Sequence, residues 1–299
     1  MDLSRENLDT LFTGFQALLN RGLEQADTSY LKWCDEVRSS TAAEIYPLLT
    51  LSGSMREWIG DRVINSASPE KMTLVNKDFE RTEGIPANAV ADDRYNVYGR
   101  IFTLMGVDAG NLWAELATQA LCEPGNWADG SPFYGPHEFG VTTIDNKLGT
   151  LELTVKNYEA ARKRMMAFCG ADGKPLRLVP DTIIVGPDLE GLAKTIFEAD
   201  LVNDGTNAAV SNIHKGECEV CVNYGMTGTY AKYWFVACTK RGIKPVVVQK
   251  RKDGPLVRKD KDTDDIVFWQ NDLVYGYHSR GAALASMPHL IIGSFPANE

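Results

Sequence analysis

The sequence predicts an α+β fold with at least two subdomains, on the basis of three changes of pattern along the chain. Helical and polar strand-like segments fill the first half, strands and helices alternate in the centre, and short strands dominate the last third. Such segregation of helices and strands is typical of α+β folds. With 299 residues, of which 44% are hydrophobic, the chain is long enough to bury a sizeable core.

The first element expected is a helix from Ser4 to about Leu23, because apolar residues recur there at helical spacing and Ser4 suits the N-cap position. The stretch that follows is mixed and contains Pro47. We therefore interpret residues 1–51 as an arm that needs another surface to pack on.

A polar hairpin is expected next, within residues 52–84. Segments 58–64 and 72–79 have strand character, and residues 66–70 (SASPE) have the composition of a turn. Charged residues interrupt both strands, so neither is suited to burial on both faces. Because an isolated two-stranded ribbon is marginally stable, this one should protrude or lie on a neighbouring molecule.

The longest helix is predicted over 96–122, after Asp92 and Asp93, whose carboxylates suit a helix N-terminus. The sequence Glu123-Pro124-Gly125 should end it. Gly106 and Gly110 are unfavourable inside a helix, and they indicate a bend or a close packing contact.

The central part is expected to alternate between helix and strand. Thr154 should cap a helix that reaches Cys169, and a strand over 180–185 should lead through Pro187 into another helix. A charged loop over 250–265 is expected in the last third. The further strands predicted are 220–222, 233–238, 245–249, 266–269, 273–277 and 290–292.

Candidate chemical sites are few. Cys218 and Cys221 form a CxxC with His214 upstream, but a structural zinc needs four ligands and the chain has no second pair, so buried strand cysteines are favoured. His137 beside Glu138 is interpreted as a solvated or hydrogen-bonded loop histidine. Nucleophile-elbow, phosphate-loop and dinucleotide motifs are absent. We therefore predict no catalytic residue, cofactor or metal.

The charge balance bears on partners. A net charge of −9 and a pI of about 5.1 argue against gripping nucleic acid as the main role. The basic residues of 250–261 alternate with aspartates, which favours a solvated hairpin loop over a DNA contact. No apolar run approaches the roughly 20 residues that span a bilayer, and the N-terminus lacks the features of a secretory signal. Synthesis in the cytoplasm, with mostly reduced cysteines, is expected.

Ordered stretches of the chain resemble the major head subunit of Mu-like bacteriophages. The strongest is Met55–Arg62 (MREWIGDR), and no single stretch is diagnostic, so the order and spacing carry the resemblance. Together they cover most of 52–201, about half of the chain. The other stretches are Asn76–Glu80, Gly84–Pro86, Asp92–Asp93, Tyr98–Gly106, Asp129–His137 and Pro180–Glu190.

The resemblance implies the Hong Kong 97-like phage capsid fold and a non-enzymatic role. The subunit would assemble into pentamers and hexamers that form an icosahedral head around double-stranded DNA. The implied parts are an N-terminal arm (1–51), an extended β-hairpin called the E-loop (52–84), a peripheral domain with a long spine helix (85–154), an axial α/β domain (155–230) and a return to the peripheral sheet (231–299).

The ribbon also supplies the candidate contacts between subunits. Its apolar candidates are Trp58, Ile64, Met72 and Phe79, and its charged candidates are Arg62 and Lys77. Further implied partners are a separate scaffold protein, a portal, an optional decoration protein and packaged DNA held without sequence specificity; no membrane is expected. The location would be the virion capsid, after assembly in the host cytoplasm.

Three alternatives stay open at this stage. The same fold also builds encapsulin-like nanocompartment shells, which enclose an enzyme instead of a genome. A cytoplasmic α/β enzyme without a recognisable motif would have similar apolar helices. A minor head or tail component would differ mainly in copy number.

Overall fold

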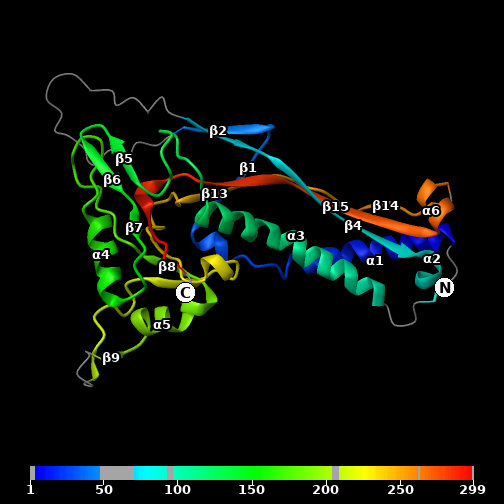
Figure 1. The fold of residues 1–299 in the computed structure, drawn as a ribbon. Helices are drawn as coiled ribbons and strands as arrows, with labels where there is room; N and C mark the ends of the chain where they lie inside the picture. The colour runs from blue at the N-terminus through cyan, green and yellow to red at the C-terminus, as the bar shows by residue number, and fades with distance from the viewer. Residues whose placement is uncertain (1–3, 48–70, 93–96, 204–208, 262, 298–299) are drawn as a thin grey trace.

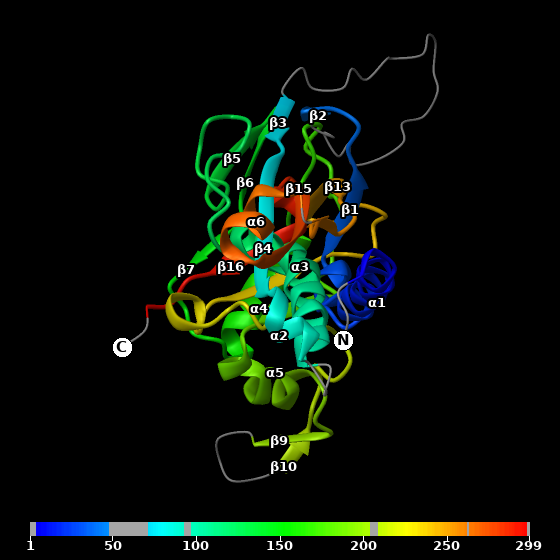
Figure 2. The same ribbon diagram turned by 90° about the vertical axis from the view of Figure 1, so that its right-hand side faces the viewer.

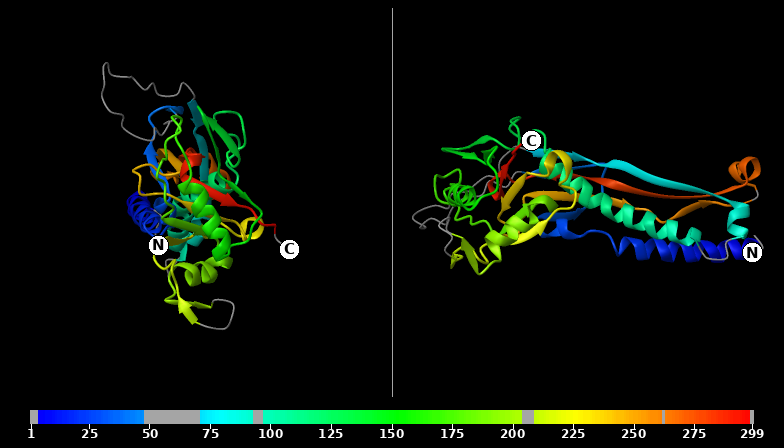
Figure 3. Two further views of the ribbon diagram at one scale, coloured as in Figure 1. Left: turned by 90° about the vertical axis from the view of Figure 1, so that its left-hand side faces the viewer. Right: turned by 60° about the horizontal axis from the view of Figure 1, so that its bottom comes forward.

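The computed structural model describes residues 4–47, 71–92, 97–203, 209–261 and 263–297. Two units are visible. An elongated unit contains a long sheet with two long helices beside it, and a compact unit lies at one end of it (Figures 1 and 3).

In the sheet of the elongated unit, β1 pairs with β13, β13 and β14 pair one after the other with one edge of β15, and β4 pairs with the opposite edge of β15. Its longest strand is β15 (Asp272–Ala285), which pairs antiparallel with β4 (Lys77–Pro86) along ten residue pairs. The remaining members are β1 (Cys34–Arg38), β13 (Val246–Asp253) and β14 (Val257–Lys259). Strands from the first and last thirds of the chain therefore form one sheet.

Two helices pack along this unit, α1 (Arg5–Leu23) and α3 (Val97–Cys122). The 26 residues of α3 correspond to about 39 Å of helix, which gives the unit its length. The rings of Phe15, Phe102 and Tyr275 pack together, with centroids 4.0 to 5.4 Å apart. This cluster joins both helices to the sheet. Two short helices, α2 (Ala87–Ala91) and α6 (Asp265–Gln270), lie at the end farthest from the compact unit (Figure 1).

The compact unit is built on a second sheet with the order β11–β8–β12–β16–β7. All four residues of its strand β8 (Thr182–Val185) are buried. The other strands are β7 (Lys147–Gly149), β11 (Glu219–Val222), β12 (Trp234–Ala237) and β16 (Ile291–Ser294). The helices here are α4 (Val155–Met166) and α5 (Glu190–Phe197).

Three two-stranded pairs complete the fold: β2 (Ala43–Pro47) with β3 (Lys71–Val75), β5 (Pro136–Phe139) with β6 (Thr142–Asp145), and β9 (Leu201–Asn203) with β10 (Ala209–Ser211). The β2–β3 and β9–β10 pairs lie at opposite extremes of the view along the long axis (Figure 2). Short 3-10 helices occupy Ser29–Lys32, Pro187–Leu189, Gly228–Tyr230 and Pro288–Leu290.

Several predictions from the sequence are confirmed. Helices cover Arg5–Leu23 and Val97–Cys122, and the Thr154 side chain accepts a hydrogen bond from the Asn157 amide at the start of α4. Ser4 occupies the N-cap position of α1 but makes no side-chain capping bond. The helix after Thr154 ends at Met166, three residues before the predicted end.

Two predictions need correction. Residues 266–269 belong to helix α6, not to a strand, because Asp264 takes the N-cap position and Asn271 ends the helix with φ 56°. Four apolar residues in a row, as in 266–269, do not by themselves distinguish helix from strand.

The return of 231–299 to the long sheet is partial, because β12 and β16 pair with each other and β12 with β8 in the compact sheet.

Candidate assembly surfaces

The β2–β3 pair joins the end of the predicted arm, which contains β2, to the predicted ribbon, which contains β3. On β3, Met72 and Leu74 are buried and alternate with exposed residues. On the opposite face, the side chains of Ile45 and Val75 are 57% and 60% exposed. Because paired and alternate residues share a face, these two form an uncovered apolar strip on the outside of the pair.

The second half of the predicted ribbon is part of the body. After Asn76 the chain continues as β4, which pairs with β15 from Lys77 to Pro86. Thus residues 71–75 and 77–84 find their backbone partners in β2 and β15 of the same chain. This corrects the expectation that the whole strip 52–84 depends on a neighbouring copy for its contacts.

The six predicted contact residues differ in position and burial. Trp58, Arg62 and Ile64 lie outside the described residues. Met72 is only 7% exposed and packs in the main core, which corrects its selection as a contact for a neighbour. Phe79, half-buried, and Lys77, exposed, lie on β4 beside β15.

Phe79 lines a groove of about 570 Å³ between β4, β15 and α3. The groove is lined by the acidic residues Asp78, Glu80, Asp108 and Glu115 and by Arg81. Asp78 also pairs with Arg280 of β15 at 3.3 Å. Arg81 pairs with Glu83 at 2.8 Å and with Asp108 of α3, which ties the strand to the helix.

The outer end of the elongated unit carries two exposed aromatic rings. Phe268 and Trp269 of α6 are 72% and 78% exposed, and their rings pack edge to face with centroids 5.0 Å apart. This exposed pair was not predicted, because residues 266–269 were expected to form a strand. The adjacent pair Phe-Trp following Asp264 and Asp265 was the signal available in the sequence.

Two of the six basic residues of 250–261, Lys250 and Arg258, form ion pairs within the chain. Lys250 pairs with Glu36 at 2.7 Å and lies 4.9 Å from the centre of the Trp113 ring. Arg258 pairs with Asp260 at 3.2 Å and lies over the Phe12 ring. Residues 250–253 and 257–259 belong to strands β13 and β14, which pair one after the other with β15, so the prediction of a charged hairpin loop over 250–265 is wrong.

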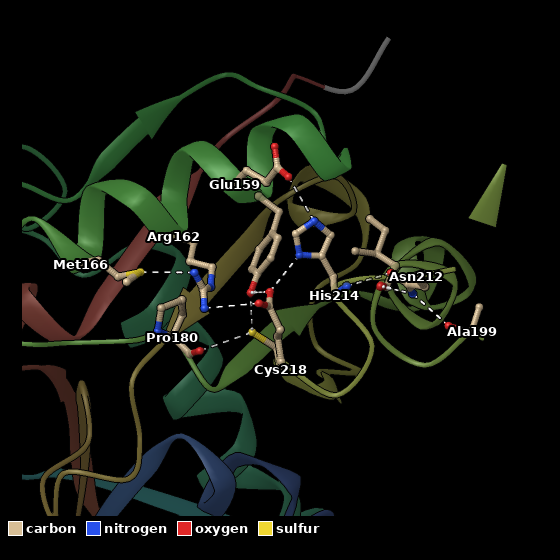
Figure 4. A network of polar contacts seen from close by, with 11 residues as sticks. Glu159, Arg162, Met166, Pro180, Ala199, Asn212, His214 and Cys218 are labelled. Atoms are coloured by element: carbon tan, nitrogen blue, oxygen red, sulfur yellow. Dashed lines mark hydrogen bonds and ion pairs between the residues drawn. The ribbon is translucent and has the colours of Figure 1, made fainter. Parts of the chain in front are cut away.

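His214 is the centre of a polar network in the compact unit (Figure 4). Its Nδ1 lies 2.9 Å from Glu217 Oε2, and its Nε2 lies 3.2 Å from Glu159 Oε1 on α4. Burial raises the pKa of Glu217, but hydrogen bonds from His214 and Tyr158 and the charge of Arg162 outweigh it, so the pKa of this carboxyl is lowered.

The network lacks the contact between a histidine nitrogen and a cysteine sulfur that would activate the cysteine as a nucleophile. The Cys218 sulfur contacts the Tyr158 hydroxyl at 3.4 Å, and both ring nitrogens of His214 face carboxylates. Burial raises the pKa of the Cys218 thiol to about 12. Cys218 and Cys221 are buried, as predicted. We conclude that the network fixes the connection between α4 and β11.

The second histidine site is also internal. His137 is fully buried, in β5 instead of a loop, and its ring nitrogens lie 2.7 Å from Asp129 Oδ2 and 2.9 Å from the Phe133 carbonyl oxygen. The hydrogen-bonded alternative is confirmed, whereas the solvated alternative and the loop position are wrong. Neighbouring His289 has its pKa lowered to about 4, first by burial and then by the charge of His137.

Within the part of the chain that the structure describes, no group of three His, Cys, Asp or Glu side chains is arranged to hold a metal ion. The described helices include none with the length and apolar character needed to cross a membrane.

Comparison with known proteins adds a family relationship. The family model of the Mu-like prophage major head subunit gpT matches residues 8–147, 146–224 and 222–296. The major capsid protein of Escherichia phage Mu is 23% identical over 283 residues, covering 95% of this chain and 72% of that protein. The Mu-like prophage FluMu major head subunit of Haemophilus influenzae is 24% identical over 293 residues, covering 97% and 74%.

Solved structures with a similar fold come from phage-type shells. The procapsid of bacteriophage JBD30 matches with a TM-score of 0.59 and 22% identity, covering 99% of this chain and 77% of that one. The capsid of the native GTA particle matches with a TM-score of 0.58 and 10% identity, covering 91% of each chain. The architecture described above is therefore that of the Hong Kong 97-like phage capsid subunits.

Proposed function

The chain belongs to the family of Mu-like prophage major head subunits and is a structural capsid subunit, and from that premise we propose how it joins its neighbours. The elongated unit corresponds to the peripheral domain with α3 as its spine helix, and the compact unit corresponds to the axial domain. The ribbon that β2 and β3 begin is the E-loop, and it lies on an adjacent copy in pentamers and hexamers.

The observation that carries this proposal is the uncovered strip on the β2–β3 pair. Ile45 and Val75 are more than half exposed although Met72 and Leu74 on the opposite face of the same pair are buried. An apolar strip beside a polar ribbon is a surface suited to a modest, repeated contact of the kind from which symmetric shells are built.

A second contact with another copy is proposed at the outer end of the elongated unit. Phe268 and Trp269 together leave roughly 300 Å² of mainly apolar surface uncovered, given the exposed fractions stated above and aromatic side chains of 150–250 Å². A standard interface covers about 800 Å² on each partner. The two rings would therefore form the centre of such a contact, and aromatic residues are frequent at these positions.

The remaining partners follow from the role of a head subunit. We propose a scaffold protein, a portal and an optional decoration protein as partners, with assembly in the host cytoplasm. The net charge of −9 suits a wall that does not grip the packaged DNA. Repulsion of this kind acts over about 8 Å at physiological salt.

The proposal is tested by replacing residues 54–66 with a short Gly-Ser linker, which keeps β2, β3 and Asn76. The variant should fold, as judged by circular dichroism and thermal unfolding, but should give few closed particles in negative-stain microscopy. Shells in normal number and of normal size from this variant would refute the role proposed for the ribbon.

A further inference from the structure

The root of the ribbon, which is the point where β2 and β3 leave the long sheet, is held by a buried polar network around Asn76. This residue lies between β3 and β4 and is only 5% exposed. Its side-chain amide donates to Ser39 Oγ at 3.2 Å and to the Thr41 carbonyl oxygen at 3.0 Å. Its side-chain oxygen accepts a hydrogen bond from Gln249 Nε2 at 2.7 Å. Every polar group of the Asn76 side chain is thus engaged.

Gln249 joins the network to the long sheet. It is fully buried on β13, opposite Val37 of β1 and Ala282 of β15. Its side-chain oxygen accepts a hydrogen bond from the Tyr46 hydroxyl of β2 at 2.7 Å. Its side-chain amide also donates to the Leu74 carbonyl oxygen of β3 at 3.5 Å, so one side chain of the long sheet binds both β2 and β3.

A second connection runs through Ser39 and Glu44. The Glu44 carboxylate accepts hydrogen bonds from Ser39 Oγ and the Ser40 amide, each at 2.9 Å, and from the Thr41 amide at 3.2 Å. These bonds, led by that of Ser40, lower the pKa of Glu44. These hydrogen bonds connect the turn between β1 and β2 to the same network.

A buried network in which every member is paired favours one geometry over its alternatives. Rotating the β2–β3 pair about its root would break the bonds to Gln249 and leave buried amide groups without partners, and such groups are unfavourable in the low dielectric of a core. The apolar residues Met72 and Leu74 alone would not impose a direction, because apolar contacts are not directional.

We propose that Gln249 and Asn76 are positioning residues that fix the angle at which the ribbon leaves the subunit, and thereby the geometry with which neighbouring subunits join. This inference rests on the proposed function of the ribbon. Both the root and the surface of the ribbon would then determine whether subunits close into a shell of one size.

The test compares two tyrosine variants. Tyr46→Phe removes the hydroxyl that binds Gln249 and keeps the ring. Tyr134→Phe is the matched control, since the Tyr134 hydroxyl donates to the Leu121 carbonyl oxygen at 2.9 Å in the core away from the root. The diameters and the closed fraction of assembled particles are measured by electron microscopy, and the melting temperature of each subunit is measured in parallel.

We expect Tyr46→Phe to broaden the diameter distribution and to lower the closed fraction at least threefold, while Tyr134→Phe, at a comparable melting temperature, assembles like wild type. Gln249→Leu should have the larger effect of the two root variants. The inference is overturned if Tyr46→Phe and every root variant that folds give closed shells like those of wild type. If wild type itself forms no shells, the proposed function fails instead, and the inference with it.

Discussion

Gly22 of α1 and Gly106 of α3 face each other where the two helices cross, in backbone contact. A Cβ atom placed on Gly106 would lie 2.1 Å from the Leu19 carbonyl oxygen and 2.9 Å from the Gly22 Cα. A Cβ atom on Gly22 would lie 2.1 Å from the Thr103 carbonyl oxygen. The two glycines thus permit the N-terminal helix to pack closely against the spine helix, and Gly106 marks the close contact that the sequence had indicated.

We predict that Gly106→Ala destabilises the subunit although alanine favours helices by about 1 kcal/mol over glycine. The added methyl group must push the two backbones apart, which should cost about 1–3 kcal/mol, as overpacked cores do. The free energy of unfolding from urea titration measures the change. Gly14→Ala is the control, because no atom lies within 4 Å of a Cβ at this position of α1, and it should stabilise. A Gly106→Ala variant as stable as wild type would contradict the crossing described.

The exposed rings of α6 give a second prediction. The double variant Phe268→Ser, Trp269→Ser should change the free energy of unfolding by less than about 0.5 kcal/mol, because both side chains are largely exposed. It should nevertheless reduce the yield of particles in sedimentation. Trp269→Phe, which keeps an aromatic ring, should retain most of the yield. Normal yield from the double variant would exclude these rings as a contact.

The lowered pKa of Glu217 predicts a loss of stability in acid. Because its pKa in the folded chain is below the ordinary value of 4.5, its contribution is complete above about pH 4.5 and declines as the pH falls through the lowered value. The facing groups are His214, Tyr158 and Arg162. Melting temperatures measured from about pH 6 to 3 should fall less steeply for Glu217→Gln than for wild type. Parallel curves would show that the carboxylate is not responsible.

The lowered pKa of His289 predicts a loss of stability at a higher pH than that expected from Glu217. Its pKa of about 4 lies below the ordinary value of 6.5, so the unfolded chain binds the proton more readily and stability is lost as the pH falls from 6.5 towards 4. At 1.36 kcal/mol per pKa unit, the full loss is on the order of 3 kcal/mol. His289→Phe should keep the packing on Phe139 and flatten this part of the stability profile. An unchanged slope between these pH values would contradict the assignment.

The sequence predicted the long helices and the capped α4, because sustained periodicity and an N-cap residue are local signals. It did not predict the helix at 265–270, whose apolar run is too short to distinguish helix from strand. The Asn76–Gln249 bond joins residues 173 positions apart, and no local pattern indicates such a pair. For the same reason the burial of Met72 was missed, since alternation in β3 shows that one face is apolar but not what covers it.

Copies of this chain are proposed to join through the ribbon that begins at β2 and β3. Electron cryomicroscopy of particles formed by the wild-type chain with its scaffold would show this contact. We expect closed shells in which residues 48–70 lie on an adjacent copy, with Ile45 and Val75 at the boundary between the two copies. A small soluble oligomer with that segment packed on its own chain would contradict it.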